Sequence, residues 1–190
     1  MSVFRCASNV ALVLAILLAS SSWGSALACG NALIYSFLFA KHPEARVAYK
    51  AELAARRDGL YEAAQFPSQP GLSYHKWSFG RAEAALDRVH ERLRRHVSAD
   101  GGELSANLML ADEVYVAEVS TSADAPRFTK SLTGLQQSPS VDAYTTVNAL
   151  LALEDGNLNW QTALELGLVV PAAGTNSGHF ADIFGKLYVQ

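Results

Sequence analysis

The strongest structural constraint in this sequence is a continuous apolar stripe between Ser78 and Val97. Apolar side chains recur there at three- and four-residue intervals, which places them on one face of an α-helix. Ser78 is a suitable N-cap, and Ser98 with Asp100-Gly101-Gly102 supplies a stop signal. Such a helix has to bury its apolar face, and the chain is long enough to close a single hydrophobic core around it. The stripe consists of Phe79, Ala82, Leu86, Val89, Leu93 and Val97.

Two partly alternating segments predict a β-hairpin after this helix. Residues 104–110 (LSANLML) and 113–119 (EVYVAEV) carry valine and tyrosine at spacings that suit strands. The turn is expected near Ala111-Asp112. Residues 120–140 are rich in Ser, Thr, Ala and Pro, which predicts a surface connection with a short helical turn around Leu132.

Another helix is predicted to begin at Pro43. Proline suits the first turn of a helix, and Glu44 suits the positive end of its dipole. Asp58-Gly59 weakens the middle of the pattern, so the helix can break there. Residues 66–75 contain two prolines and a glycine and predict a loop. The expected apolar face comprises Ala45, Tyr49, Leu53, Leu60 and Ala64.

The C-terminal third combines cap residues with short apolar runs. Residues 140–154 fit either one helix or a strand through Tyr144–Val147 that leads into a shorter helix. Asn159 suits the N-cap of a helix over 160–166, and Gly167 suits its end.

Leu168–Val170 predicts a short buried strand, and Gly174–Gly178 predicts a break before a last amphipathic segment. Together the elements predict an α+β fold. It is a mostly helical single domain at residues 43–190 with a small antiparallel β element, after an N-terminal signal peptide. The last segment is expected to pack through Phe180, Ile183, Phe184 and Leu187.

The first 28 residues resemble a secretory signal peptide. Arg5 is followed by an apolar run from Val10 to Ala19 and by Ala26-Leu27-Ala28. A membrane-spanning helix takes about 20 residues, so this run is too short unless Asn31–Ala40 joins it as an uncleaved anchor. Residues 29–42 are expected to form an apolar N-terminal segment or tether.

Removal of the leader would leave Cys29 as the single cysteine of an exported protein. Its position after the small residues resembles the lipobox of bacterial lipoproteins, which implies acylation of Cys29 and membrane attachment through it. That motif favours leucine three residues before the cysteine, where this chain has Ala26. The same residues also fit an ordinary signal-peptidase site, which leaves a soluble protein. Both readings place the chain in the periplasm or lipid-anchored in the cell envelope.

One stretch carries a family resemblance. In residues 148–170 a Leu-Leu pair and a glycine turn precede an Ala-x3-Gly-x-hydrophobic pattern. This pattern resembles the tail of sterol-carrier-type lipid-binding domains. We carry over neither an activity nor site residues from that family.

Charge and ligand spacing exclude several classes of function. The chain has 15 basic and 18 acidic residues, and the leader removes one basic residue, so nucleic acid is not the expected partner. His90 and His96 lie about 9 Å apart along a helix and on different sides of it, which does not suit one metal ion. No metal site or cofactor is expected.

A catalytic triad is also not assigned. Ser177, His179 and Asp182 have suitable chemistry, but they lie close together in sequence and lack a nucleophile motif. No catalytic residue is therefore predicted.

Four arginines on the helix at 78–97 are the main candidate contacts with a ligand or partner. They alternate with acidic residues, which favours a solvated helix with intrahelical pairs such as Glu91 with Arg95. The aromatic residues Tyr74 and Trp77 at the start of the helix are further candidates, because apolar pockets are commonly lined by such rings. The four arginines are Arg81, Arg88, Arg92 and Arg95.

These observations favour an exported envelope binding or accessory protein that is not an enzyme and recognises a protein partner or a small apolar ligand. Two alternatives remain. One is a hydrolase-like envelope enzyme whose site is assembled from scattered residues. The other is a structural or assembly protein that acts through the helix at 78–97.

Overall fold

The computed structural model describes residues 35–62, 64–100, 103–130, 140–174 and 177–188. Contacts between residues divide the chain into two units, Met1–Lys41 and His42–Gln190. In the first unit, residues 35–41 are helical, and the rings of Tyr35 and Phe39 lie 5.7 Å apart. The predicted signal peptide and Cys29 lie outside the described residues.

The second unit has the α+β fold that the sequence predicts. Its sheet is larger than a hairpin, because three further strands join the predicted pair. In chain order the elements are α2 (Pro43–Arg57), α3 (Tyr74–Asp100), β1 (Ser105–Leu110), β2 (Tyr115–Ser120), β3 (Arg127–Lys130), β4 (Ala143–Thr145), α5 (Val147–Glu154), α6 (Trp160–Glu165), β5 (Val170–Pro171) and α7 (Ser177–Tyr188).

The sheet has the strand order β3-β2-β1-β4-β5. β1 and β2 form the predicted antiparallel hairpin, with Ser105 opposite Ser120 and Leu110 opposite Tyr115. β4 lies parallel to β1, and β5 lies antiparallel to β4. The expectation of an irregular surface connection at 120–140 was wrong in part, because residues Arg127–Lys130 form β3 and pair with β2. The helical turn expected near Leu132 lies outside the described residues.

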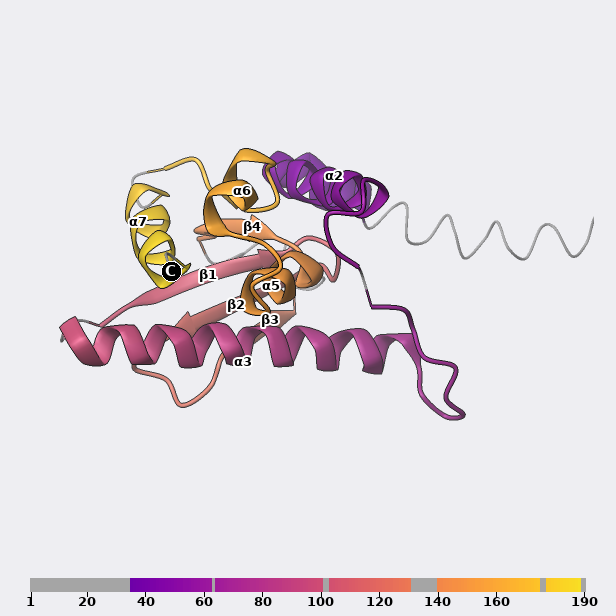
Figure 1. Ribbon diagram of the computed structural model, residues 1–190, viewed down its shortest axis with the longest axis horizontal. Helices are drawn as coiled ribbons and strands as arrows, with labels where there is room; N and C mark the ends of the chain where they lie inside the picture. The colour runs from indigo at the N-terminus through magenta and orange to yellow at the C-terminus, as the bar shows by residue number, and fades with distance from the viewer. Residues whose placement is uncertain (1–34, 63, 101–102, 131–139, 175–176, 189–190) are drawn as a thin grey trace, which may run out of the picture. The chain divides into compact units, whose positions relative to one another are not determined.

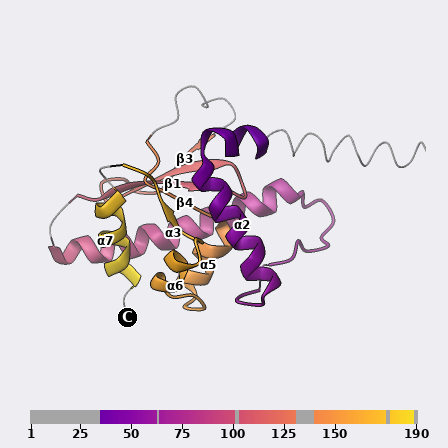
Figure 2. The same ribbon diagram turned by 90° about the horizontal axis from the view of Figure 1, so that it is seen from above.

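Helices α3, α5 and α6 lie on one side of this sheet (Figures 1 and 2). Alternate residues of β1 and β2 enter the core beneath them, including Leu108, Leu110, Ala117 and Val119. The predicted stripe of α3 supplies the facing side, with Leu86, Val89 and Leu93 almost fully buried. The longest helix and the sheet therefore form the two layers that position the remaining elements.

The two central helices begin and end for local reasons. α3 begins four residues before the expected cap, because the hydroxyl of Ser73 accepts a hydrogen bond from the amide of Lys76 at 3.2 Å. Ser78 is not the cap. α2 ends at Arg57, and Gly59 follows with a φ of +70° that favours glycine.

The buried face of α2 differs from the predicted one. Leu53 and Leu60, expected in the core, are 47% and 38% exposed. The alanines allow the helix to approach β4 and β5 closely, so small side chains rather than large ones occupy the contact. The buried residues of α2 are Ala45, Ala48, Glu52 and Ala55.

The alternative left open at residues 140–154 resolves as a strand followed by a short helix. Ser140 and Asp142 do not open a helix. Instead Thr146 is the N-cap of α5, and its hydroxyl oxygen accepts a hydrogen bond from the amide of Ala149 at 3.3 Å. α6 begins as predicted, with the Asn159 side chain accepting from the amide of Thr162 at 2.8 Å.

His90 is the unusual member of the buried face of α3. It is 2% exposed, and neither ring nitrogen has a hydrogen-bond partner within the described parts of the chain. A buried polar group without a partner costs about 1–3 kcal/mol.

We therefore expect His90→Leu to raise the free energy of unfolding by about 1–3 kcal/mol, since it removes this cost and keeps a similar volume. Helix propensity alone would contribute a few tenths of a kcal/mol. Chemical denaturation followed by circular dichroism measures the change. A loss of stability would mean that the ring of His90 has a polar partner in solution.

Candidate functional site

A buried carboxylate on α2 organises the polar side of the domain. Glu52 is 2% exposed, although it lies on a helix face otherwise made of alanines. It accepts hydrogen bonds from the phenol of Tyr61, from Thr146 Oγ1 at 3.0 Å and from Asn148 Nδ2 at 2.8 Å. We call these four residues the Glu52 network. The network joins α2, the segment that follows it, and the first turn of α5.

The network fixes the amide of Asn148. Its nitrogen donates to Glu52, so its oxygen faces the opposite way and accepts a hydrogen bond from Arg81 at 2.6 Å. The guanidinium carbon of Arg81 also lies 4.9 Å from the centre of the Trp77 ring. Burial lowers the pKa of Arg81, while the nearby carboxylates of Asp112 and Glu113 oppose that effect. Arg81 is therefore a half-buried cation held by a neutral amide and an aromatic ring.

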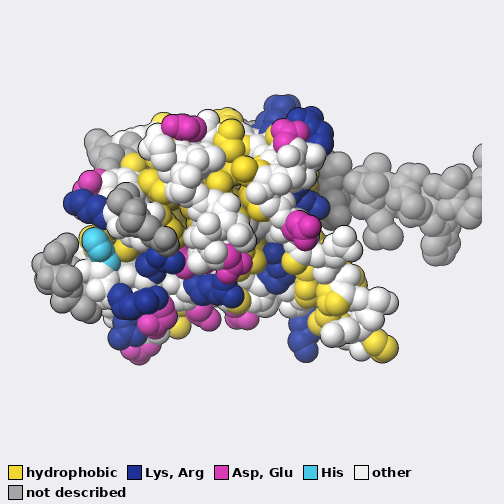
Figure 3. Space-filling view, viewed as in Figure 1, with side chains coloured by type: hydrophobic (Ala, Val, Ile, Leu, Met, Phe, Trp, Pro, Cys, Tyr) yellow, Lys and Arg dark blue, Asp and Glu magenta, His cyan; other side chains and the backbone are white. Residues whose placement is uncertain are grey.

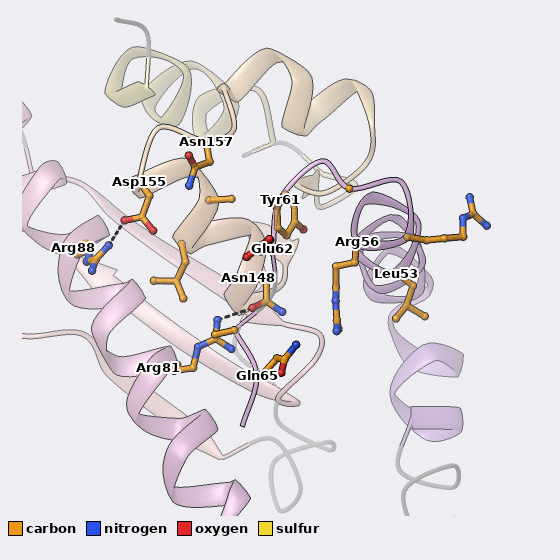
Figure 4. Close-up of a pocket in the computed structure, with 15 residues that line it drawn as sticks. Leu53, Arg56, Tyr61, Glu62, Gln65, Arg81, Arg88, Asn148, Asp155 and Asn157 are labelled. Carbon is orange, nitrogen blue, oxygen red and sulfur yellow. Dashed lines mark hydrogen bonds and ion pairs between the residues drawn. The ribbon is translucent and has the colours of Figure 1, made fainter. Parts of the chain in front are cut away.

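Arg81 lines a cleft of about 1010 Å³ between α2, the following segment, α3 and α5. Figure 4 shows Arg56, Gln65, Arg81 and Asn148 around the same hollow, although they come from different elements. Leu53 and Leu151 add apolar surface, and Tyr61 and Asn157 are among the other lining residues. We call this hollow the arginine cleft.

The arginines of the cleft differ in their partners. Arg88 pairs with Asp155 at 2.6 Å, and Arg57 pairs with Asp58 at 2.9 Å. Within the described part of the chain, neither Arg56 nor Arg81 has a carboxylate at ion-pair distance. Among the described residues, no acidic side chain pairs directly with either of these two positive charges.

The arginine stripe predicted to face solvent instead joins α3 to other elements. Arg81 binds Asn148, Arg88 binds Asp155, and Arg92 binds Glu154 at 3.2 Å. The expectation of intrahelical pairing was therefore wrong for these three, because α5 packs directly against α3 and supplies their partners. Arg95 is exposed and donates to the carbonyl of Glu91 rather than to its carboxylate.

The remaining candidate contacts lie in two places: Tyr74 and Trp77 are beside the cleft, and Arg92 is next to α7. Tyr74 and Trp77 contact each other and Phe66 beside the cleft. Arg92 also donates to the carbonyl of Leu187 and lies over the Tyr188 ring, so it anchors α7. The side chains of residues 177–179 lie outside what the structure describes.

Three important residues were absent from the sequence prediction. Glu52, Asn148 and Asp112 come from separate segments that only the fold brings together. One signal was available: Glu52 shares helical spacing with Ala45, Ala48 and Ala55, and a carboxylate within such a face implies a buried partner.

The turn between β1 and β2 places two acidic side chains against α3 and the start of α5, beside the Glu52 network. Both carboxylate oxygens of Asp112 lie 3.1 Å from the backbone amide of Val147, at the start of α5. Glu113 accepts from Ser78 Oγ at 2.9 Å. Val114 follows with a φ of +59°, a strained conformation for a β-branched residue. The turn is thus held in an unfavourable geometry that directs two acids towards α3 and α5.

Neither a family model nor a curated protein nor a solved structure shows significant similarity to the chain. Within the described residues, no group of three or more His, Cys, Asp or Glu side chains is arranged to hold a metal ion. No helix in the same residues has the length and hydropathy needed to cross a membrane.

The partly buried carboxylate of Asp112 predicts a pH dependence of stability. Burial, followed by the charges of Glu113 and Glu52, raises its pKa from 3.8 to about 7, although the Val147 amide opposes the shift. Between these values the folded protein keeps a proton that the unfolded chain releases. Stability therefore falls as pH rises through this window, by up to about 1.4 kcal/mol per pH unit.

Asp112→Asn keeps an acceptor for the Val147 amide but cannot titrate. We expect it to flatten the decline in unfolding free energy between pH 4 and 7. Denaturant titrations of both proteins across this range measure the difference. Asp124→Asn, at an exposed position, is the matched control and should leave the wild-type profile unchanged. Parallel profiles for wild type and Asp112→Asn would contradict the prediction.

Proposed function

We propose that this protein is an exported binding protein of the cell envelope that holds a small anionic ligand in the arginine cleft. The observation that supports this most directly is the pair of guanidiniums, Arg56 and Arg81, that face one hollow without an ion-pair partner among the residues that the structure describes. Guanidinium groups bind carboxylates and phosphates through charge-assisted hydrogen bonds, often two at a time.

Several of the surrounding groups suit the same ligand, although the carboxylates of Glu62 and Asp155 also line the cleft. Gln65 and Asn157 add side-chain amides to the lining, and these can donate to further oxygens of an anion. The Glu52 network holds Asn148 and thereby Arg81 in place before a ligand arrives, which reduces the entropy cost of binding. Export and attachment through Cys29 remain part of the proposal, and the leader sequence is their support.

The other hypotheses receive less support. An assembly role through the helix at 78–97 would use arginines such as Arg88 and Arg92 as partner contacts, but these two are bound to Asp155 and Glu154. Charge reversal at these positions would disturb the contact between α3 and α5 and would not isolate a partner surface.

A small apolar ligand is the second candidate, and one observation favours it. A pocket of about 110 Å³ lies where α7 meets α3 and β1. Its volume suits a group no larger than a single ring. Most of its lining is apolar and comes from Leu93, Leu104, Ala106, Phe180, Ile183 and Phe184.

Isothermal titration with inorganic phosphate, acetate and citrate, at constant ionic strength, tests the anion proposal. We expect Arg56→Gln and Arg81→Gln each to weaken binding about tenfold or more, because each removes a charge-assisted hydrogen bond. Arg46→Gln is the matched control, since Arg46 is exposed on the same helix as Arg56 and does not line the cleft.

Phosphate and the carboxylates distinguish the two kinds of anion. Failure of all of these probes, and of their phenyl derivatives, to bind the wild-type protein would overturn the proposal. Binding that Arg56→Gln and Arg81→Gln leave unchanged would also overturn it, since the anion would then lie elsewhere.

A further inference from the structure

Three aromatic rings form a cluster beside the arginine cleft. Phe66 lies on the segment before α3, and Tyr74 and Trp77 lie one turn apart on the first turns of α3. The ring centres of Phe66 and Tyr74 lie 5.7 Å apart, and each of them lies 5.5 Å from the ring centre of Trp77. We call these residues the aromatic cluster.

Two large side chains of the cluster are unusually exposed to solvent. Tyr74 is 61% and Phe66 is 42% exposed. Figure 3 shows hydrophobic side chains at the surface where the segment before α3 projects, at the lower right. Single exposed apolar residues are common on proteins, but a contiguous group of rings indicates a surface that binds something.

Arg81 makes the cluster continuous with the cleft. Its guanidinium lies over the ring of Trp77 at 4.9 Å and donates to Asn148 in the cleft. Gln65 lines the cleft, and Phe66 is the next residue along the chain. One cation thus contacts the aromatic surface and the polar hollow together.

Local structure holds the rings ready. Ser73 caps α3 and thereby sets the positions of Tyr74 and Trp77. Phe66 is brought back to them by a compact turn, in which the Leu72 amide donates to the Gln69 carbonyl at 3.3 Å and Gly71 has a φ of +78°. Such a turn limits the freedom that the segment would lose when a ligand binds.

We infer that the ligand is an anion joined to an aromatic group, with its acid in the arginine cleft and its ring on the aromatic cluster. This inference rests on the proposed function, because the acid is placed by Arg56 and Arg81. Aromatic rings pair with one another edge to face or in offset stacks, and a guanidinium stacks on a ring face. A ligand with a ring next to its acid satisfies both surfaces at once.

Matched pairs of acids test the inference on the full chain. Phenyl phosphate is compared with inorganic phosphate, and phenylacetate is compared with acetate, by isothermal titration. We expect each phenyl compound to bind about tenfold or more tightly than its partner. The double variant Phe66→Ala/Tyr74→Ala should lose this advantage and keep the affinity for phosphate and acetate.

Two further variants keep the test specific. Leu166→Ala removes an apolar side chain of similar exposure, 49%, at the C-cap of α6 and should leave the phenyl advantage intact. Phe66→Leu/Tyr74→Leu keeps apolar surface without rings, and we expect it to lose most of the advantage. Thermal unfolding followed by circular dichroism confirms that each variant is folded.

The contrary outcomes are distinct. If phosphate or acetate binds but the phenyl group adds nothing, the inference is wrong and the proposed function stands. If citrate binds and none of the four compounds does, the inference is wrong and the proposed function stands, and if citrate also fails to bind, both fail. A third outcome is that the wild type shows no phenyl advantage but sediments with phosphatidylglycerol vesicles or self-associates. If the double variant abolishes that behaviour, the rings bind a lipid surface or a second copy of the chain, and the inference is overturned.

Discussion

The hydrogen bonds around Glu52 are the interaction on which the arrangement of the arginine cleft depends. A carboxylate removed from water has a large desolvation cost, which only close donors can offset. Here the donors are neutral and come from Tyr61, Thr146 and Asn148. Because they lie on different segments, satisfying one buried acid fixes the relative positions of α2, the segment after it, and α5.

The arginines of α3 show how the same residue type takes different roles in one helix. Arg88 and Asp155 are half exposed, so their pair contributes little to stability. Glu154 is almost fully buried and is bound by Arg92 and Tyr188, which ties α3 and α7 to α5. Arg81 differs because its partner is an amide without charge. The neutral partner leaves its positive charge available at the edge of the cleft.

The polar and strained features of the fold meet around the start of α5. Thr146 caps the helix and donates to Glu52, while Asp112 accepts from the amide of Val147. The acid and its neighbour Glu113 are directed there by a turn that holds Val114 at a positive φ. Strain of this kind persists where the surrounding structure compensates for it, and such positions are common at functional sites.

The sequence by itself determined the elements whose signals are local. The apolar stripe predicts α3, partial alternation predicts the hairpin, and Asn159 predicts the start of α6. The sequence could not determine which face of α2 is buried. Alanine carries a weak hydrophobic signal, whereas Leu53, on the other face, carries a strong one. The site belongs to tertiary structure alone: Glu52 meets Thr146 and Asn148 across 94 and 96 residues of chain. Periodicity and capping act within a few turns, whereas the pairing of a buried acid with its donors is decided when the helices pack.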